Sequence, residues 1–469
     1  MPLILPGNVG SATAATGFNV DNSLRFNGGS SDYLNRTNAT PTNQLIWTFS
    51  FWVKLSDITD AQGSGNQMLL SDFGSASNRG TIFFESDDTL TISDRVSNSF
   101  TFKYVTTRLF RDVSAWYHIV INHNRTLSTP VTKVYVNGVQ ETSFSTSTNP
   151  SQNGTSYFNV DGQASYVGKY GGGNEYYNGY LAEAVWIDGQ ALDADQFGEF
   201  DEDSGIWKPI DVSGLTFGTN GFYLDFEDSS ALGNDANGSN NWTSNNFAAI
   251  NQTTDTCTNN FATMNPLDNY FAGSTFSEGN CKIVTTGGNI TYNTSTMGFS
   301  SGKWYMEVKL GSSSGEVLGV IRGVSTGNNN DNKIGNRSDG FGYDYRGLVE
   351  GNGADLGGTF AAFDSGDVIG VYADLDNNEL YFSKNGTLQN SGTGLTLPAG
   401  TYFFAVGDNH GSNAATLEVN FGNPISALDN TAITDDNGHG AFEYSPNITG
   451  DSVAKKFYAL NTKNLAEFG

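Results

Sequence analysis

Carboxylates that alternate along a strand could hydrolyse glycosidic bonds, and the sequence offers two such groups. A retaining glycosidase needs two carboxyl groups about 5 Å apart, and alternation along a strand puts them on one face. The first group, Glu199-Phe-Asp201-Glu202-Asp203, follows an expected helix instead of lying inside a strand. The second, Glu85-Ser-Asp87-Asp88, lacks a second glutamate. Hydrolysis of a polysaccharide is therefore the weaker interpretation, and the sequence favours a protein that is not an enzyme.

Oxygen ligands for a hard cation gather in one short Gly- and Asn-rich stretch. They are Asp225, Asp228, Asp235 and Asn237. Calcium accepts such oxygens, and Ca²⁺ is the one cofactor that the sequence suggests. The same residue types form Asx-turns in polar loops, so a structural role is the alternative. A second acidic run, Asp374-x-Asp376-x-Asn378, lacks the glycine and the distal glutamate of a calcium loop and predicts no site.

Thiols and imidazoles are too few and too scattered for a zinc centre. The chain holds two cysteines, Cys257 and Cys281, and four histidines. Free buried thiols and a disulfide that closes the intervening loop are both open alternatives. His118 and Asn122 share one face of an alternating run, and we expect that face to meet solvent or a groove.

Composition and charge limit the class of protein. The 469 residues include 57 glycines and 13% aromatics, which favours short strands joined by tight turns. A net charge of −26 repels phosphate backbones and anionic lipid surfaces, so we expect neither nucleic acid nor membrane insertion. No run approaches the roughly 18 apolar residues of a membrane span. The start of the chain has no basic region typical of a secretion signal, so we expect synthesis in a cytosol.

Two hairpins about 250 residues apart predict the fold. Asn137-Gly138 ends one alternating strand and Asn385-Gly386 ends another. Asn-Gly tolerates positive φ at both central turn positions, so it strongly predicts a hairpin between alternating apolar residues. The expected fold class is all-β, with two antiparallel β-sandwiches in tandem after a short N-terminal arm.

Changes in composition predict the boundaries of the domains. We expect an arm over 1–20, the first sandwich over 21–208, a linker with an extra strand over 209–260, the second sandwich over 261–425 and a C-terminal segment over 426–469. Alternation puts four large apolar residues of the first sandwich on one face, namely Trp47, Phe49, Phe51 and Val53. Asp193 is expected to cap a short helix over 194–200.

Ordered sequence pieces carry two resemblances. Leu-Arg-Phe-Asn, Phe-Ser-Phe-Trp-Val-Lys, Trp-Tyr-His-Ile-Val, Val-Tyr-Val-Asn-Gly and Gly-Tyr-Leu-Ala-Glu-Ala-Val-Trp succeed one another within residues 21–208. This region resembles the laminin-G-like family of concanavalin A-type jelly rolls. Residues 261–425 resemble the SPRY family through Lys-Trp-Tyr-Met-Glu-Val and Asp-Val-Ile-Gly-Val before the Asn-Gly turn. The second resemblance implies binding of partners through loops, here Asn328 to Asn332, Arg346, Asp408, Asn409 and His410.

The order of these pieces along nearly the whole chain is similar to that of appendage and tail-fibre-associated structural proteins of marine tailed bacteriophages. Met-Pro-Leu-Ile-Leu-Pro-Gly, Gly-Ile-Trp-Lys-Pro, Phe-Tyr-Leu-Asp-Phe and Asn-Pro-Leu-Asp-Asn add to that order. The resemblance implies a virion surface protein made in the bacterial host cytoplasm. Its arm would dock onto other virion proteins, and we expect a homo-oligomer.

Host recognition is the function that this resemblance implies. The partner would be a host-surface glycan or protein, and aromatic loops could stack on sugar faces. The best candidates are Tyr170, Tyr176 and Tyr177 beside Gly171–Gly173, although ordinary tyrosines at strand ends would look the same. The alternatives are an architectural capsid-decoration or tail cement protein and, less favoured, a polysaccharide depolymerase.

Overall fold

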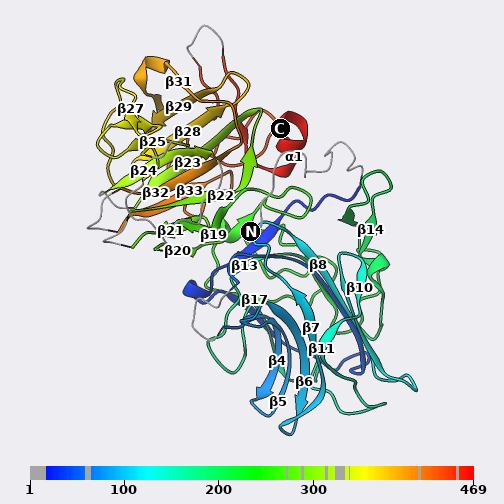
Figure 1. Cartoon of the computed structure of the whole chain (residues 1–469). Helices are drawn as coiled ribbons and strands as arrows, with labels where there is room; N and C mark the ends of the chain where they lie inside the picture. The colour runs from blue at the N-terminus through cyan, green and yellow to red at the C-terminus, as the bar shows by residue number, and fades with distance from the viewer. Residues whose placement is uncertain are drawn as a thin grey trace. The chain divides into compact units, whose positions relative to one another are not determined.

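The computed structural model describes residues 17–58, 65–270, 273–286, 290–311, 315–322, 333–336, 339–409, 414–449 and 454–469. The described residues up to Thr258 form one compact unit, and those from Asn259 onward form a second. Each unit is built on two antiparallel sheets, so the expected all-β class with tandem sandwiches is confirmed (Figure 1). The expected N-terminal arm falls mostly outside the described residues.

Two sheets form the first sandwich. Sheet 1 has the order β10 (Val139–Glu141), β9 (Val131–Val136), β8 (Tyr117–Asn124), β3 (Ile46–Leu55), β13 (Gly179–Asp188), β1 (Ser23–Phe26) and β18 (Gln252–Thr253), with β16 (Phe222–Leu224) paired to β13. Sheet 2 has the order β11 (Phe144–Thr148), β7 (Ser99–Leu109), β6 (Thr89–Val96), β5 (Asn78–Phe84), β4 (Gln67–Ser75), β12 (Ala164–Val167), β2 (Tyr33–Thr37) and β17 (Thr243–Asn245). Strands β16, β17 and β18, from the expected linker, thus extend both sheets.

The core of the first sandwich follows the predicted alternation. Trp47, Phe49, Phe51 and Val53 all point into one cluster, where they meet residues of sheet 2 such as Ile82. Strand β3 is nonetheless buried on both faces, because residues 192–223 pack over the outside of sheet 1. This cover corrects the expectation for His118 and Asn122, which are 1% and 4% exposed and face neither solvent nor a groove.

The contacts of the buried His118 are all structural. Its ring stacks on Trp52 at 4.7 Å, and the Nε1 atom of Trp207 donates a hydrogen bond of 2.9 Å to its Nδ1 atom. Burial lowers the pKa of His118 to about 3, so the imidazole is neutral at physiological pH.

The expected helix over 194–200 is wrong. Only a single 3₁₀ turn, Ala194–Gln196, forms there, and strand β14 (Gly198–Phe200) follows and pairs with β15 (Trp207–Pro209). Asp193 makes no side-chain capping bond. Its carboxylate instead accepts hydrogen bonds from Tyr135 (2.6 Å) and Lys133 (2.9 Å) on β9, which offer a stronger partnership than a helix end.

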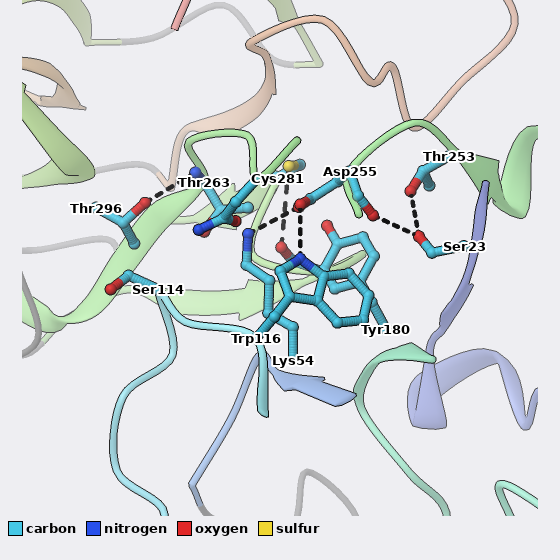
Figure 2. Close-up of polar contacts among 12 residues, drawn as sticks. Ser23, Lys54, Ser114, Trp116, Tyr180, Thr253, Asp255, Thr263, Cys281 and Thr296 are labelled. Atoms are coloured by element: carbon cyan, nitrogen blue, oxygen red, sulfur yellow. Dashed lines mark hydrogen bonds and ion pairs between the residues drawn. The ribbon is translucent and has the colours of Figure 1, made fainter. Parts of the chain in front are cut away.

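A cluster that we call the clasp closes the first sandwich where its first and last strands meet (Figure 2). The clasp consists of Ser23, Lys54, Trp116, Thr253 and Asp255. Lys54 Nζ and Asp255 Oδ2 lie 2.7 Å apart with both side chains 1% exposed. Trp116 Nε1 donates to Asp255 Oδ1 at 3.1 Å, and Ser23 Oγ donates to the Asp255 carbonyl at 2.6 Å. A buried ion pair with these added bonds ties the end of the unit to its first strands.

The second sandwich also has two sheets. Sheet 3 has the order β19 (Met264–Tyr270), β22 (Thr291–Phe299), β32 (Tyr402–Asp408), β24 (Glu316–Arg322), β25 (Gly340–Asp344), β26 (Val349–Gly351) and β27 (Ala354–Asp355). Sheet 4 has the order β20 (Thr275–Ser277), β21 (Lys282–Val284), β33 (Thr416–Asn420), β23 (Lys303–Leu310), β28 (Val368–Asp374), β29 (Glu379–Lys384) and β30 (Thr387–Leu388), with β31 (Leu395–Thr396) on β29 and β34 (Tyr458–Ala459) on β23.

The C-terminal segment covers the outside of sheet 4. Phe442, Ile448 and Phe457 pack on Tyr305 and Tyr372, which point away from the main core. Helix α1 (Thr462–Phe468) ends the chain and is capped by the Asn461 side chain. The outer face of sheet 4 is therefore occupied by the protein itself.

Candidate functional site

Sheet 2 carries large aromatic and basic side chains on its outer face. Alternation along β5 points Ile82 and Phe84 into the core and Arg79 to the outside. The same rule applies to β2, where Leu34 is in the core and Tyr33 is outside. Neighbouring strands place these outward residues side by side, and Arg79 lies directly opposite Arg95 in the β5–β6 register.

We call this surface the aromatic–basic face. It comprises Tyr33, Phe73, Arg79, Arg95, Phe100, Lys103, Tyr166, Lys169 and Tyr170, all of which are partly or well exposed. It runs from β7 to β2, five interstrand steps of about 4.8 Å, or roughly 24 Å. The strands concerned are drawn in blue and cyan in Figure 1.

Each cation on this face lies over an aromatic ring. Lys169 Nζ is 4.3 Å from the centroid of Tyr33 and 5.9 Å from that of Tyr166. Arg79 lies 5.7 Å above Tyr170, whose ring meets Phe73 edge-on at 5.3 Å. Such cation–π contacts hold each ring and its cation in a fixed relative position.

Small hydroxyl groups lie between the large side chains. Thr81 and Ser93 share a hydrogen bond of 2.9 Å. Nearby, Gly171 N donates to Ser71 Oγ at 3.3 Å, which holds the 168–177 hairpin against β4. These hydroxyls are buried and serve the sheet itself, so the partly exposed rings are the groups that could cover the apolar faces of a sugar.

The predicted tyrosines occupy three different positions. Tyr170 belongs to the aromatic–basic face, and Tyr176, 6% exposed, lies beneath it with its ring 5.5 Å from Lys169 Nζ. Tyr177 is fully buried in the core, and its hydroxyl donates to the Lys54 carbonyl at 2.8 Å. The expectation that the Tyr177 ring is accessible to a sugar is therefore corrected.

Sequence reasoning missed Tyr33, Tyr166 and the basic residues of the face. In Tyr33-Leu-Asn-Arg and Ser165-Tyr-Val, successive side chains alternate between the two faces of a strand. This alternation was the only local signal that Tyr33 and Tyr166 point outward. Their convergence depends on β12 pairing with β2, strands far apart in the sequence, and that pairing could not be read from either segment alone.

Two of the second-sandwich candidates meet at one carboxylate. Arg346 pairs with Asp344 Oδ2, and Asn409 Nδ2 donates to the same oxygen at 3.0 Å. Asp408 is fully buried and accepts a hydrogen bond of 2.9 Å from Thr285 Oγ1, so its side chain is not exposed to a binding protein. His410 and Asn328 to Asn332 lie outside the described residues.

The aspartates considered as calcium ligands accept hydrogen bonds from backbone amides of the first unit. Asp235 is 4% exposed, and its carboxylate accepts from the amides of Tyr223 (2.9 Å), Asn237 (3.2 Å) and Asn240 (3.0 Å). Asp225 and Asp228 accept from the amides two positions ahead in Asx-turns. Within the described parts of the chain, no group of three or more His, Cys, Asp or Glu side chains is placed to hold a metal ion.

The paired acids considered for hydrolysis serve local structure. Asp201 accepts hydrogen bonds from Ser204 and Lys208, which lower its pKa to about 2, and Lys208 also pairs with Glu199 at 3.4 Å. Glu85 accepts from Thr91 Oγ1 at 2.6 Å and lies 3.8 Å from Lys103. The Glu199, Asp201 and Glu85 carboxylates are thus engaged by hydroxyl groups and lysines of their own surroundings, as expected for a structural role.

Both cysteines are free thiols, which leaves the disulfide alternative without support. Burial raises the pKa of Cys257 well above its ordinary value, so this thiol is unreactive. Among the described residues, no helix is both long and apolar enough to cross a bilayer.

Each sandwich matches the model of a known protein family. Residues 27–196 match the family model of the concanavalin A-like lectin/glucanases superfamily, and residues 303–424 match that of the SPRY domain. No curated protein matches the chain.

Solved structures similar to parts of the chain have low identity. The SPRY domain of human HERC1 is 19% identical, with 33% of this chain and 96% of that chain covered and a TM-score of 0.29. A heptameric SAP-like pentraxin from Limulus polyphemus is 19% identical, with 38% and 80% covered and a TM-score of 0.28. A Bacteroides ovatus protein provisionally described as carbohydrate binding is 16% identical, with 49% and 59% covered and a TM-score of 0.34. By the two family models, residues 27–196 carry a concanavalin A-like jelly roll and residues 303–424 carry a SPRY domain.

Proposed function

We propose that the protein is a non-enzymatic binding protein whose first sandwich holds a glycan on the aromatic–basic face. The observation that carries the proposal is the row of partly exposed rings around Lys169 and Arg79. Apolar side chains that are scattered singly over a surface need no explanation, but several rings next to one another on one sheet mark an interaction site. The superfamily match at residues 27–196 adds support for glycan binding, since that superfamily is named for lectins and glucanases, both of which bind glycans.

The second sandwich would hold a protein partner or part of the same assembly. Asp344 is 2% exposed and gathers Arg346 and Asn409 at one end of sheet 3, which gives that end a fixed polar surface. Fixed polar groups favour specific recognition, because they lose little entropy on binding.

The protein would act on the surface of a virion, as an appendage or tail-fibre component that recognises a bacterial host. The order of the sequence pieces supports this setting, as does a charge of −26, which keeps a protein soluble in salt water. Docking through residues 1–20 and self-association belong to the same proposal. Mass spectrometry of purified particles and antibody labelling in electron micrographs test it; a signal at the capsid shell alone would favour the architectural alternative.

Glycan binding is tested with the full chain on an array of host-surface and reference glycans. The double variant Tyr33→Ala/Tyr166→Ala should weaken binding to any positive glycan at least tenfold, about 1.4 kcal/mol. The matched control is Phe200→Ala, which removes a ring that is 50% exposed on β14, away from the face. Equal binding by the double variant would refute the proposal, provided that its melting temperature matches that of the control. Release of reducing ends during incubation would instead indicate a depolymerase.

A further inference from the structure

Cations collect on the aromatic–basic face against the overall charge of the chain. The sequence has 23 basic and 49 acidic residues, yet four bases lie on this one face. Among the described residues, Arg79, Arg95 and Lys169 form no ion pair within 4.0 Å, and Lys103 approaches Glu85 only at 3.8 Å. Most other bases of the first unit are paired with acids. Lys54 and Arg125, for example, each lie 2.7 Å from an aspartate oxygen.

The two arginines also oppose each other. Arg79 and Arg95 are direct neighbours in the β5–β6 register, and like charges in that position destabilise a sheet. Each guanidinium uses few of its donors: Arg79 bonds the Ala76 carbonyl, and Arg95 Nη1 donates to Asn98 at 3.2 Å. The Nε atom of Arg95 is buried with no hydrogen-bond partner. A surface anion would not reach this buried atom, but two neighbouring guanidinium charges without a counter-charge favour an anion at their exposed Nη atoms.

We infer that the glycan held by the aromatic–basic face is an acidic polysaccharide, whose carboxylate or sulfate groups pair with Arg79, Arg95 and Lys169 while its rings stack on the aromatics. This inference rests on the proposed function. The spacing supports a polymer: Arg95 contacts Phe100 at 4.3 Å at one end, and Lys169 contacts Tyr33 at the other. A ligand that spans both ends must extend across several strands, as an oligosaccharide does.

The net charge of −26 does not oppose this binding at the salt concentration of seawater or of cells. The Debye length is about 8 Å at 0.15 M ionic strength, so acidic groups elsewhere on the surface are screened. Charges within contact distance of the ligand are screened much less. The cations of the aromatic–basic face then make the net interaction with an acidic ligand attractive.

The test titrates the full chain with dextran, dextran sulfate and polygalacturonate, which represent a neutral, a sulfated and a carboxylated polymer. We expect both acidic polymers to bind at least tenfold more tightly than dextran, and the stronger of the two identifies the acid group. The double variant Arg79→Gln/Arg95→Gln should lose at least tenfold in affinity for them.

A matched control removes the same charge from the same sandwich. Arg108 and Arg111 are 46% and 58% exposed in their side chains but pair with Glu141 and Asp88. Arg108→Gln/Arg111→Gln should retain the affinity for acidic polymers within about twofold. An equal loss in both double variants would overturn the inference, because it would reveal attraction by charge alone.

A stability measurement gives a second readout. Removal of one of two opposed charges should raise the melting temperature of Arg79→Gln slightly in the absence of ligand, since the repulsion disappears. Acidic polymer should then stabilise the wild type more than this variant. If the face binds neutral glycans and Arg79→Gln/Arg95→Gln leaves that binding intact, the proposed function stands and the inference fails. If the variant Tyr33→Ala/Tyr166→Ala binds every glycan like wild type, the proposed function itself fails.

Discussion

The two sandwiches differ in which sheet face remains open. Residues 192–223 cover the outside of sheet 1 in the first sandwich, and Phe442, Ile448, Phe457 and Ala459 cover the outside of sheet 4 in the second. Sheet 2 keeps an outer face rich in rings and cations, whereas the apolar outer face of sheet 4 is filled by Phe442 and Phe457. Similar architecture therefore leaves one outer face open, where we propose that the ligand binds, and one outer face covered by the chain itself.

Loss of the clasp should produce the largest difference in stability between the two sandwiches. Lys54→Ala leaves the buried carboxylate of Asp255 without its counter-charge, and we expect a loss of about 3–5 kcal/mol in the stability of the first sandwich. The second sandwich should unfold as before, which two-transition denaturation in urea would show. The control is Lys309→Ala, because its partner Asp429 is 81% exposed and the pair should contribute about 0–1 kcal/mol. Equal losses of stability in Lys54→Ala and Lys309→Ala would contradict the conclusion that the buried Lys54–Asp255 pair holds the first sandwich together.

A change in pH should alter the stability of both sandwiches through one buried glutamate in each. Burial raises the pKa of Glu183 in the first sandwich to about 8 and that of Glu307 in the second to about 7, from an ordinary value of 4.5. At these two carboxyls the folded protein holds protons that the unfolded chain releases, so their contribution to stability falls as pH rises from about 4.5 towards 7 or 8.

Variants identify which sandwich responds. Calorimetry at pH 6.5 and pH 8 should show higher melting temperatures at pH 6.5; below pH 6.5 the buried neutral His118 and His123 oppose this trend, because the unfolded chain binds protons that they do not. Glu183→Gln should flatten the pH response of the first sandwich alone, and Glu307→Gln that of the second alone. A stability that rises with pH over this range would contradict these protonation states.

The two Asn-Gly turns give the smallest expected effect. Gly138 and Gly386 have φ of 76° and 74°, and a Cβ atom would lie 2.2 Å from Trp207 and 2.5 Å from Tyr444. Alanine at either position should cost about 1–2 kcal/mol from backbone strain alone. The steric part should be greater for Gly138→Ala, because a hydrogen bond to His118 holds Trp207 in place.

The control for these variants is Gly205→Ala. Its φ of 69° is similar, but no atom lies within 4 Å of the added Cβ. Thermal unfolding of the three variants separates conformational strain from contact with the ring. Identical losses at all three glycines would show that neither aromatic residue restrains its turn.

Local patterns predicted the fold but only part of the candidate site. Alternation around Trp47 and the Asn-Gly turns sufficed for two sandwiches, because period-2 burial and turn geometry are encoded within a few residues. The face of His118 was misjudged because its cover comes from residues 192–223, and polar side chains such as His118 are equally compatible with a buried hydrogen-bonded site. Tyr170 was found from its glycine-rich neighbourhood, whereas Tyr33 joins it only through long-range pairing of β2 with β12.

The clasp also determines how the first sandwich would respond to tension. The chain enters at Ser23 and leaves at Thr253, which are paired in β1 and β18, so a pull on the two ends separates neighbouring residues one pair at a time. Beyond them, Thr258 exchanges hydrogen bonds with the Val20 backbone, and the Lys54–Asp255 pair lies on the exit side. Mechanical load would therefore reach these few polar contacts before it reaches the sheets, and the ligand-holding face would stay folded until they part.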